Sequence, residues 1–305
     1  MPFSTTTSPI LQLSSVTTSE DSARDFLISE GILRPNINCA TCSCPMVRKP
    51  CSRTKSMDLQ HWTCSPCRRS VTIREGSVLK GKKISCADFI SLLFWFSTPG
   101  LSGSTISEFT QLGEDTVSIY RRIITDEATF WFIDNAKPIG GVGKHVEIDE
   151  AKFRRMKHHR GRARAEEWVL GGVERESGRC FIVPCPNGKR TKAVLLPIIQ
   201  RWVLPGTTIY TDGWKAYQSI PAITGGYSHS WVNHTLYFKD PVTGVHTNRQ
   251  EGLWKHIRAS VTGSRTLEDS FVEFMLRKEF TSGGNTRGRD RTVLTFNGYL
   301  TILRA

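Results

Sequence analysis

The pattern of hydrophobic and polar positions changes near the middle of this 305-residue chain. In residues 85–135 apolar side chains recur at helical spacing, and Ser85 can cap the first predicted helix. Pro99-Gly100 ends that helix, and Gly113 separates two more. We therefore predict a helical region that ends at the glycine-rich segment 136–145.

Two short helices joined by a turn that contains glycine are typical of a DNA-binding helix-turn-helix. The second of these helices makes Tyr120, Arg121 and Arg122 available to a duplex. Ordinary helical hairpins have the same pattern, so both interpretations remain open.

From residue 145 onward, strands and helices are predicted in alternation. The predicted strands are HVEIDE, EEWVLGGVE, RCFIVP, TTIYTD and HSWVN. Glu176-Ser177-Gly178 fits a hairpin turn, and the last helices open near Asn248 and Leu267. The order βββαβαβα predicts an α/β fold with a ribonuclease-H-like mixed sheet and flanking helices.

Three acidic residues occupy positions that suit a two-metal nuclease. Asp149 and Asp212 each close a predicted strand, and Glu251 lies just inside a predicted helix. Carboxylates at strand ends and on a facing helix can converge, and their hard oxygens select Mg²⁺ or Mn²⁺ over zinc. Each acid taken alone is an ordinary surface residue. Together they predict a divalent-metal site that acts on phosphodiesters.

The third ligand has an alternative. Asn248 lies three residues before Glu251, on the same face of the predicted helix, and offers an amide oxygen or an N-cap. Strand alternation points Glu150 away from the face of Asp149, which gives Glu150 a supporting role at most. Arg258 follows on the helix face of Glu251 and can hold a phosphate.

The aromatic and histidine residues of this region have less specific interpretations. Trp214 and Trp254 are predicted as core anchors beside the site rather than as platforms for base stacking, and Trp168 as core. Three histidines could be read as a zinc site, but their spacing fits no compact ligand pattern; they are His229, His234 and His246.

The charge of the chain favours a polyanionic partner. It has 41 Lys and Arg against 28 Asp and Glu, a net charge of +13. Residues 152–164 carry seven Lys or Arg and no acid, and the run begins three residues after Asp149. We interpret this run as a phosphate-facing loop, with a solvated loop as the alternative. Its candidate phosphate contacts are Arg154, Arg155 and Lys157.

The cysteines are concentrated near the N-terminus. Of nine in the chain, six fall between residues 39 and 67. The pairs Cys39-x2-Cys42 and Cys64-x2-Cys67 suit a zinc ribbon, in which four thiolates hold one Zn²⁺. Either Cys44 or Cys51 can substitute for a neighbour. Free thiols and a redox pair are the alternatives.

The predicted organisation has five parts. They are a disordered leader (1–25), a zinc ribbon (26–75), a helix-turn-helix region (76–135), a ribonuclease-H-like catalytic domain (145–281) and a divergent tail (282–305). No apolar run approaches the ~18 residues of a membrane span. The Ser/Thr-rich leader favours a nuclear protein, with the bacterial cytoplasm as the alternative.

Ordered motifs from about residue 30 to 281 carry a resemblance. They are CATC…HWTCSPCRRSVTIREGSVL, HVEIDEAKF, EEWVLGGVERESGRCF, TTIYTDGWKAY, YSHSWVNHTLYFKDPVTGVHTNRQEGLWKHIR and FVEFMLRKEF. Together they resemble the Merlin-type DDE transposases and related bacterial insertion-sequence transposases. The resemblance implies cleavage at terminal inverted repeats and transfer of 3′-hydroxyls to target DNA.

By motif position, the family's three acids fall on Asp149, Asp212 and Glu251. Some bacterial relatives use the Asn of the HTN motif, here Asn248, as the third ligand. Relatives often have a Lys where this chain has Arg258, which keeps the charge and alters the geometry. The segment after 281 does not continue the family pattern.

The sequence thus predicts a Mg²⁺-dependent DNA transposase with a structural Zn²⁺, which works as a homodimer or higher synaptic assembly on double-stranded DNA. A domesticated, non-catalytic DNA-binding protein with the same fold is the alternative. A ribonuclease H or resolvase shares the acids but does not require the N-terminal modules.

Overall fold

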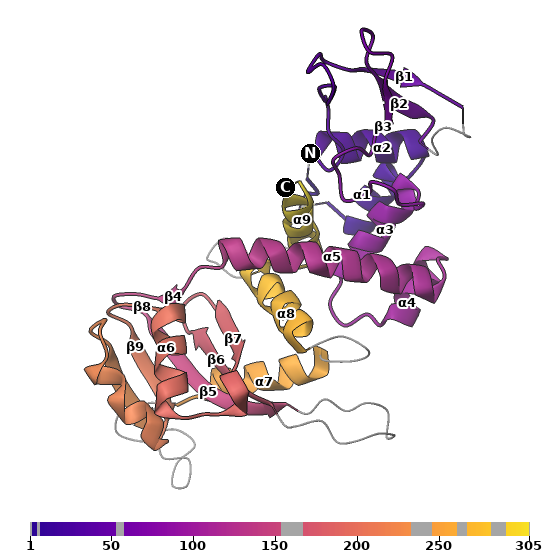
Figure 1. Cartoon of the computed structure of the whole chain (residues 1–305). Helices are drawn as coiled ribbons and strands as arrows, with labels where there is room; N and C mark the ends of the chain where they lie inside the picture. Colours follow the sequence, from indigo (N-terminus) through magenta and orange to yellow (C-terminus); the bar gives the residue numbers. More distant parts are fainter. Residues whose placement is uncertain are drawn as a thin grey trace. The chain divides into compact units, whose positions relative to one another are not determined.

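The computed structural model describes residues 2–4, 7–52, 58–153, 167–232, 246–260, 267–281 and 291–304. The chain forms two compact units (Figure 1). The first combines Met1–Trp131 with Gly288–Ala305, and the second is Phe132–Arg287. Within the described ranges, no helix has the length and apolar character of a membrane span.

The first unit joins a small sheet to a group of helices. Its elements are α1 (Pro9–Val16), α2 (Glu20–Ser29), β1 (Val47–Pro50), β2 (Gln60–Thr63), β3 (Ser70–Thr72), α3 (Cys86–Ser97), α4 (Gly103–Thr110), most of α5 (Glu114–Asn135) and α9 (Arg291–Leu303). The strands form an antiparallel sheet in the order β1-β2-β3. The predicted helices of residues 85–135 are α3, α4 and α5, and Ser85 accepts the amide of Asp88 as predicted.

The two ends of the chain meet in the core of this unit. Phe296 of α9 lies 4.6 Å from the ring centre of Phe3 and 5.8 Å from that of Phe94 in α3. The side-chain nitrogen of Asn297 donates to the carbonyl of Phe3, and its side-chain oxygen accepts the backbone N–H of Phe3. Both sets of contacts hold α9 against residues at the other end of the sequence.

The expectation of a disordered leader therefore differs from the structure, and α9, which lies within the predicted divergent tail, packs in the core. Helices α1 and α2 lie within residues 1–25 or cross their end, and they bury Leu13, Phe26 and Leu27. Serines that suggested disorder act as caps: Ser19 accepts the N–H of Ser22 at the start of α2.

For one residue in the second helix of the predicted helix-turn-helix, the predicted exposure to DNA was wrong. Tyr120 is buried, with its ring edge against Phe89 at 6.4 Å, so it is not available to a duplex. Arg122 is exposed and pairs with Asp126 at 3.8 Å. The guanidinium of Arg121 lies over the ring of Phe96.

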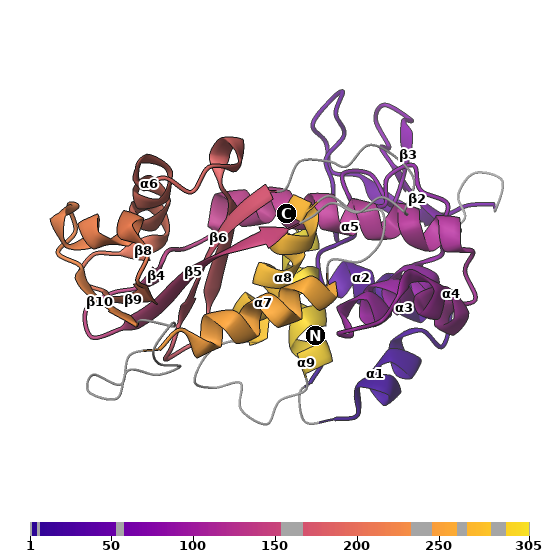
Figure 2. The same cartoon turned by 90° about the horizontal axis from the view of Figure 1, so that it is seen from below.

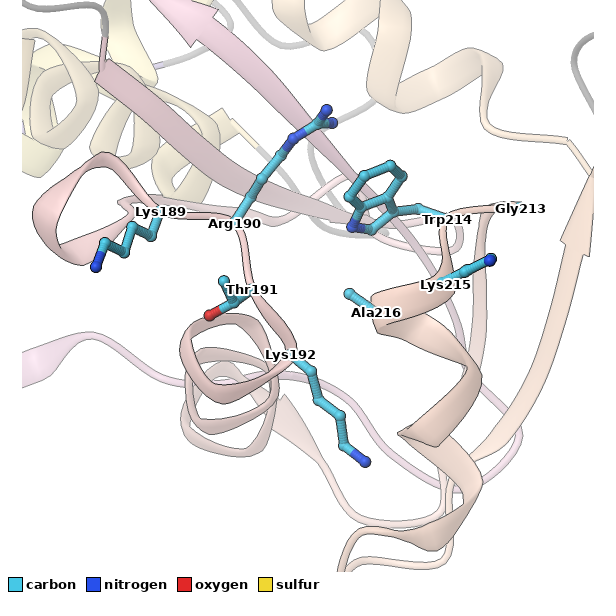
Figure 3. Close-up of a pocket in the computed structure, with 8 residues that line it drawn as sticks. All are labelled: Lys189, Arg190, Thr191, Lys192, Gly213, Trp214, Lys215 and Ala216. Carbon is cyan, nitrogen blue, oxygen red and sulfur yellow. The ribbon is translucent and has the colours of Figure 1, made fainter.

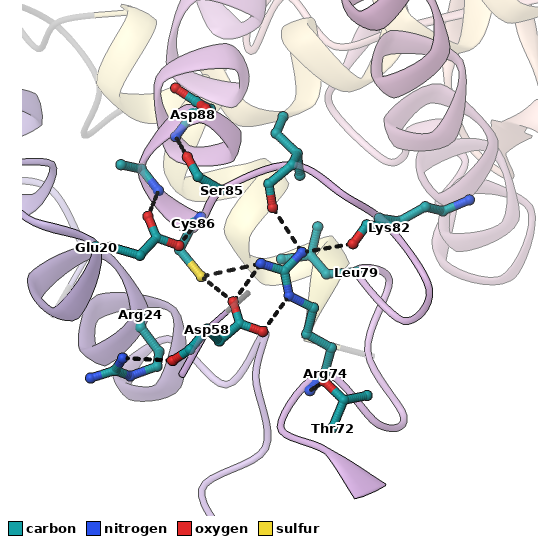
Figure 4. Close-up of polar contacts among 12 residues, drawn as sticks. Glu20, Arg24, Asp58, Thr72, Arg74, Leu79, Lys82, Ser85, Cys86 and Asp88 are labelled. Atoms are coloured by element: carbon teal, nitrogen blue, oxygen red, sulfur yellow. Dashed lines mark hydrogen bonds and ion pairs between the residues drawn. The ribbon is translucent and has the colours of Figure 1, made fainter. Parts of the chain in front are cut away.

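A buried polar network ties α2, the end of the cysteine-rich region and α3 together (Figure 4). Arg74 pairs with both carboxylate oxygens of Asp58 and donates to the carbonyl of Ile84. Glu20 accepts the first-turn amides of α3, from Cys86 and Ala87. Because these carboxylates are already neutralised by donors, the group is structural rather than a metal site.

The second unit is a mixed α/β structure. Its elements are the end of α5, β4 (Ile139–Gly140), β5 (His145–Phe153), β6 (Glu167–Glu174), β7 (Cys180–Pro184), η1 (Pro186–Gly188), α6 (Lys192–Trp202), β8 (Val203–Leu204), β9 (Thr208–Asp212), η2 (Lys215–Ala222), β10 (Ser228–Val232), α7 (Asn248–Ser260) and α8 (Leu267–Thr281). The main sheet has the order β10-β9-β5-β6-β7. Strands β5, β6 and β7 are antiparallel, and β9 and β10 run parallel to β5. All five predicted strands are present.

Alternation along β5 divides the core into two layers. Val146 and Ile148 pack with residues of α6 and η2 on one face of the sheet. Ala151 and Phe153 pack with residues of α7 and α8 on the other. Figure 2 shows α6 and α7 on opposite sides of the strands. The sheet thus places β5 centrally, between two layers of helices.

Candidate metal centre and nucleic-acid site

The candidate site lies where β5 and β9 stop pairing. Their parallel ladder runs from His145 opposite Thr208 to Glu147 opposite Tyr210 and goes no further. Each strand continues for two or more residues beyond that point, to Asp149 and Asp212. The gap between the strands therefore receives side chains from both.

Three carboxylates meet at this gap. Oxygen atoms of Asp149, Glu150 and Asp212 all lie within 4.8 Å of one another. The first and third were predicted to converge, and the structure brings them together. Glu150 was predicted to point away because of strand alternation. It joins the cluster because Asp212 lies at the open edge of β5, within reach of residues on both of its faces.

The carboxylate oxygens of the cluster differ in the hydrogen bonds that they accept. The Trp254 indole N–H donates to Asp149 Oδ2 at 3.1 Å, and the Trp214 amide donates to Asp212 Oδ1 at 2.9 Å. The side chain of Glu150 is only 2% exposed. Its Oε1 has no hydrogen-bond partner among the described residues, and the guanidinium of Arg190 is 4.0 Å away.

Burial and mutual repulsion shift the protonation of this cluster. Burial raises the pKa of Asp149 to about 6, and the neighbouring charges of Asp212 and Glu251 add to the effect. Burial also raises the pKa of Glu150 to about 7, although the nearby Tyr217 hydroxyl lowers it, and the charges of Asp212 and Asp149 add to the rise. A buried carboxyl group beside two like charges fits a divalent cation with hard oxygen ligands such as Mg²⁺ or Mn²⁺.

Glu251 and Asn248 flank the cluster. Glu251 is in the first turn of α7, outside the group of three, and its charge raises the pKa of Asp149. Asn248 is the first residue of α7. It is not the N-cap, because Thr247 supplies the carbonyl that accepts the Glu251 amide. The side-chain oxygen of Asn248 is buried and has no hydrogen-bond partner within the described part of the chain.

A carboxylate that the sequence analysis missed holds the start of α7. Glu147 is fully buried on β5, and its Oε2 accepts the amides of Arg249 at 2.9 Å and Gln250 at 3.2 Å. Its Oε1 accepts from Arg175 Nε at 2.7 Å. The negative charge thus lies at the positive end of the helix dipole. The only signal in the sequence is an acid two residues before Asp149, on the same face of the strand.

The approach of α7 also requires a small residue on β6. Gly171 lies opposite Asp149 in the antiparallel ladder. A Cβ there would lie 2.5 Å from side-chain atoms of both Gln250 and Trp254. Gly171 therefore lets α7 come close enough for the Trp254 indole to reach Asp149.

Replacing Glu147 by Gln is expected to destabilise the second unit by about 3 kcal/mol. The change leaves Arg175 without its charged partner and weakens the cap on α7. Urea unfolding measures the loss. Glu176→Gln is the matched control: it removes a partly exposed pair with His145 and is expected to cost below about 1 kcal/mol. Equal losses in the two variants would contradict the role of Glu147.

The raised pKa values predict that the metal-free protein loses stability as the pH rises. In the unfolded chain both carboxyls titrate near pH 4, whereas in the fold Asp149 and Glu150 titrate near 6 and 7. The contribution of these two carboxyls to the free energy of unfolding is fully present below about pH 4 and is lost as the pH rises through about 7. In EDTA at pH 8, Glu150→Gln is expected to raise Tm by about 5 °C over wild type. At pH 4 the two proteins should melt together; a lower Tm for the variant at pH 8 would oppose this account.

The cysteine cluster forms a second candidate metal site. The sulfur atoms of four cysteines lie within 4.8 Å of one another; they are Cys39, Cys42, Cys64 and Cys67. Cys44 and Cys51 are not members of this group. The backbone amide of Thr41, followed by that of Cys42, lowers the pKa of the Cys39 thiol to about 6. Four thiols at this separation, two on each knuckle, can bind zinc.

Three of the remaining predicted site residues lie in the described part of the chain: Arg258, His229 and His246. Arg258 is exposed in the last turn of α7, with its guanidinium 5.4 Å from the ring centre of Phe153. His229 lies 2.9 Å from the hydroxyl of Thr211, and His246 lies beside Arg175. Predictions that fall outside the described residues concern Arg154, Arg155, Lys157 and His234.

The two tryptophans predicted as core anchors differ from each other. Trp254 is 3% exposed and packs in the core beneath α7, as predicted. Trp214 is 40% exposed, so its prediction as a core residue was wrong. It follows directly after Asp212-Gly213 at the end of a strand, where the chain leaves the sheet, and the guanidinium of Arg190 lies over its ring.

Comparison with known families agrees with this geometry. Residues 138–265 match the model of the ISXO2-like transposase domain family. The matched segment runs from β4 through α7 and contains Asp149, Glu150, Asp212 and Glu251. It supports an insertion-sequence type of transposase domain over those residues. No curated protein matches the chain.

Proposed function

We propose that the protein is a metal-dependent DNA transposase that cleaves the ends of a mobile element and joins them to target DNA. The observation that carries this proposal is the convergence of Asp149, Glu150 and Asp212 at the open edge between β5 and β9, with one buried oxygen left without a donor. The match of residues 138–265 to a transposase domain supports the reaction class.

The strand order β10-β9-β5-β6-β7, with an antiparallel meander followed by parallel strands, supports a ribonuclease-H-like domain. Residues from about 30 to 281 resemble the Merlin-type branch of such transposases, which is our finer assignment. In that branch the third acid falls on Glu251, with Asn248 as the alternative. We assign Glu150 to the same metal site, beside Asp149 and Asp212.

The residues of the site have distinct tasks in this mechanism. Asp149, Asp212 and Glu150 would hold Mg²⁺ or Mn²⁺. A bound cation would supply activation of a water or 3′-hydroxyl oxygen and compensation for the charge that develops on the phosphate. The Trp254 indole fixes one oxygen of Asp149, which directs the other toward the gap. Glu147 fixes the start of α7 and with it the position of Glu251. Arg258 contacts a flanking phosphate.

The rest of the chain supplies DNA binding in this proposal. A zinc ion on the four clustered cysteines holds the ribbon, and α4 and α5 form the helix-turn-helix that recognises terminal inverted repeats. The net charge of +13 supports a polyanionic partner. Because two element ends must be brought together, we propose a dimer or higher synaptic assembly. The compartment is the nucleus, or the cytoplasm of a bacterium.

A domesticated DNA-binding protein is the second candidate function. The same fold and charge support it, and it needs no working metal site. The presence of all the acids favours the transposase, since a site without function gains nothing from repulsion among buried carboxylates.

Metal-dependent nicking of a supercoiled plasmid that carries the element's ends tests the proposal. Cleavage in Mg²⁺ or Mn²⁺, and none in EDTA, is expected. DNA binding measured by anisotropy in EDTA should weaken steeply with salt. Tight, salt-sensitive binding without cleavage in either metal would favour the domesticated protein. Neither binding nor cleavage would contradict both functions.

A further inference from the structure

A cavity of about 760 Å³ lies beside the acid cluster, between the start of α6 and the start of η2 (Figure 3). Its lining includes Lys189, Arg190, Lys192, Trp214 and Lys215. The volume is in the range of pockets that hold small ligands and is too small for a duplex. We call it the α6–η2 pocket.

The charge of this pocket is positive and uncompensated. The side chains of Lys189, Lys192 and Lys215 make no ion pair or hydrogen bond with any residue that the structure describes. Lys192 lies in the gap between α6 and η2, whereas Lys189 and Lys215 extend outward on either side of it (Figure 3). Unpaired cationic side chains in and around the cavity favour a ligand with negative charge. The first turn of α6 adds to this, because its N-cap residue Thr191 makes no side-chain cap and leaves the positive helix end open.

One wall of the pocket is formed by an arginine guanidinium that contacts two tryptophan rings. The guanidinium of Arg190 lies 4.1 Å from the ring centre of Trp168 and 4.3 Å from that of Trp214. Figure 3 shows Arg190 extending toward Trp214, with Lys192 reaching into the gap between α6 and η2. Trp214 remains 40% exposed, so it can still accept a planar group. Phosphate contacts and a stacking ring together fit a nucleotide.

The pocket is continuous with the acid cluster. The amide of Trp214 donates to Asp212, and Arg190 is the cation nearest to the unpaired oxygen of Glu150. A DNA strand whose phosphate lies at the carboxylates therefore has its neighbouring nucleotide at the pocket.

We propose that the α6–η2 pocket binds one unpaired nucleotide of the DNA strand, next to the phosphate that is cut. Lys192 holds its phosphate, and its base, out of the duplex, stacks on Trp214. This inference rests on the proposed function, since it takes DNA as the substrate. It adds a substrate feature to that function: the strand is unpaired at the site of cleavage.

Binding of fluorescein-labelled oligonucleotides to the full chain in EDTA tests the pocket separately from catalysis. The probes are a 15-nucleotide oligothymidine, the same strand without bases, and a blunt 15-base-pair duplex. Trp214→Ala is expected to weaken oligothymidine binding about tenfold and to leave the base-free strand and the duplex within about twofold of wild type. Lys192→Gln should weaken both single strands.

Leu11→Ala is the control, because Leu11 is an exposed apolar residue on α1 and is not among the residues that line the pocket. It is expected to bind all probes as wild type does. Trp214→Phe keeps a ring and should retain most of the affinity, and circular dichroism checks that each variant is folded.

Equal losses for duplex and single strand in Trp214→Ala would overturn the proposal in favour of a general phosphate surface. Unchanged oligothymidine binding would overturn it outright. Absence of cleavage by the wild-type protein would count against the proposed function and would leave this binding result standing.

Discussion

Replacing Asp149 by Asn is expected to lower metal-dependent DNA cleavage by about 10³-fold while DNA binding stays unchanged. Asp149 supplies a charged oxygen at the gap between β5 and β9, and the Trp254 indole already holds its other oxygen. An amide of the same shape keeps that hydrogen bond and loses the charge. About 4 kcal/mol of lost transition-state stabilisation corresponds to this rate.

Asp212→Asn should have an effect of similar size, because Asp212 faces the same gap from β9. Asp25→Asn is the control: it removes one negative charge from an exposed side chain in α2. Single-turnover cleavage of a labelled DNA end measures the rate, and anisotropy in EDTA measures binding. Cleavage by Asp149→Asn at the wild-type rate would remove Asp149 from the metal site. Loss of binding in the same variant would point to a structural role instead.

Replacing Cys64 by Ser is expected to release zinc and unfold the ribbon. Cys64 is fully buried and is one of the four clustered sulfur atoms, 3.5 Å from the sulfur of Cys42. The strands β1, β2 and β3 are three or four residues long. Under the zinc assignment that we propose, most of the stability of so small a sheet would come from the metal, whose binding contributes about 10–16 kcal/mol in comparable sites.

Elemental analysis of the purified variant measures zinc, and limited proteolysis reports on residues 30–75. Cys51→Ser is the matched control, because Cys51 lies in the same region and outside the cluster. It is expected to keep one zinc per chain and to resist protease as wild type does. Stoichiometric zinc in Cys64→Ser, or its loss in Cys51→Ser, would contradict the assignment of the four ligands.

Features set by local pattern could be predicted from the sequence. The strand containing Asp149 alternates in hydrophobicity, and the helix after Ser85 has its cap and its proline stop. The meeting of Asp149 with Asp212 followed from the strand order, since adjacent parallel strands end at the same edge. The cysteine spacing singled out the four sulfurs that the structure brings together.

Features set by distant partners could not be predicted. The amides that Glu147 accepts belong to residues more than 100 positions later in the chain. Glu150 was misjudged because alternation describes a continuous sheet, and the ladder with β9 ends before it. Trp214 was assigned to the core from its residue type, although its position at a strand end leaves it beside an open cavity.

The pairing of the two chain ends has a consequence for the order of events during synthesis. Residues 132–287 form one compact unit and can fold as soon as they leave the ribosome. The aromatic core around Phe3 and Phe94 lacks Phe296 until α9 has been made. The unit that carries the cysteine cluster therefore matures last, although most of it is translated first. A nascent chain would therefore complete the unit with the acid cluster before the unit with the cysteine cluster.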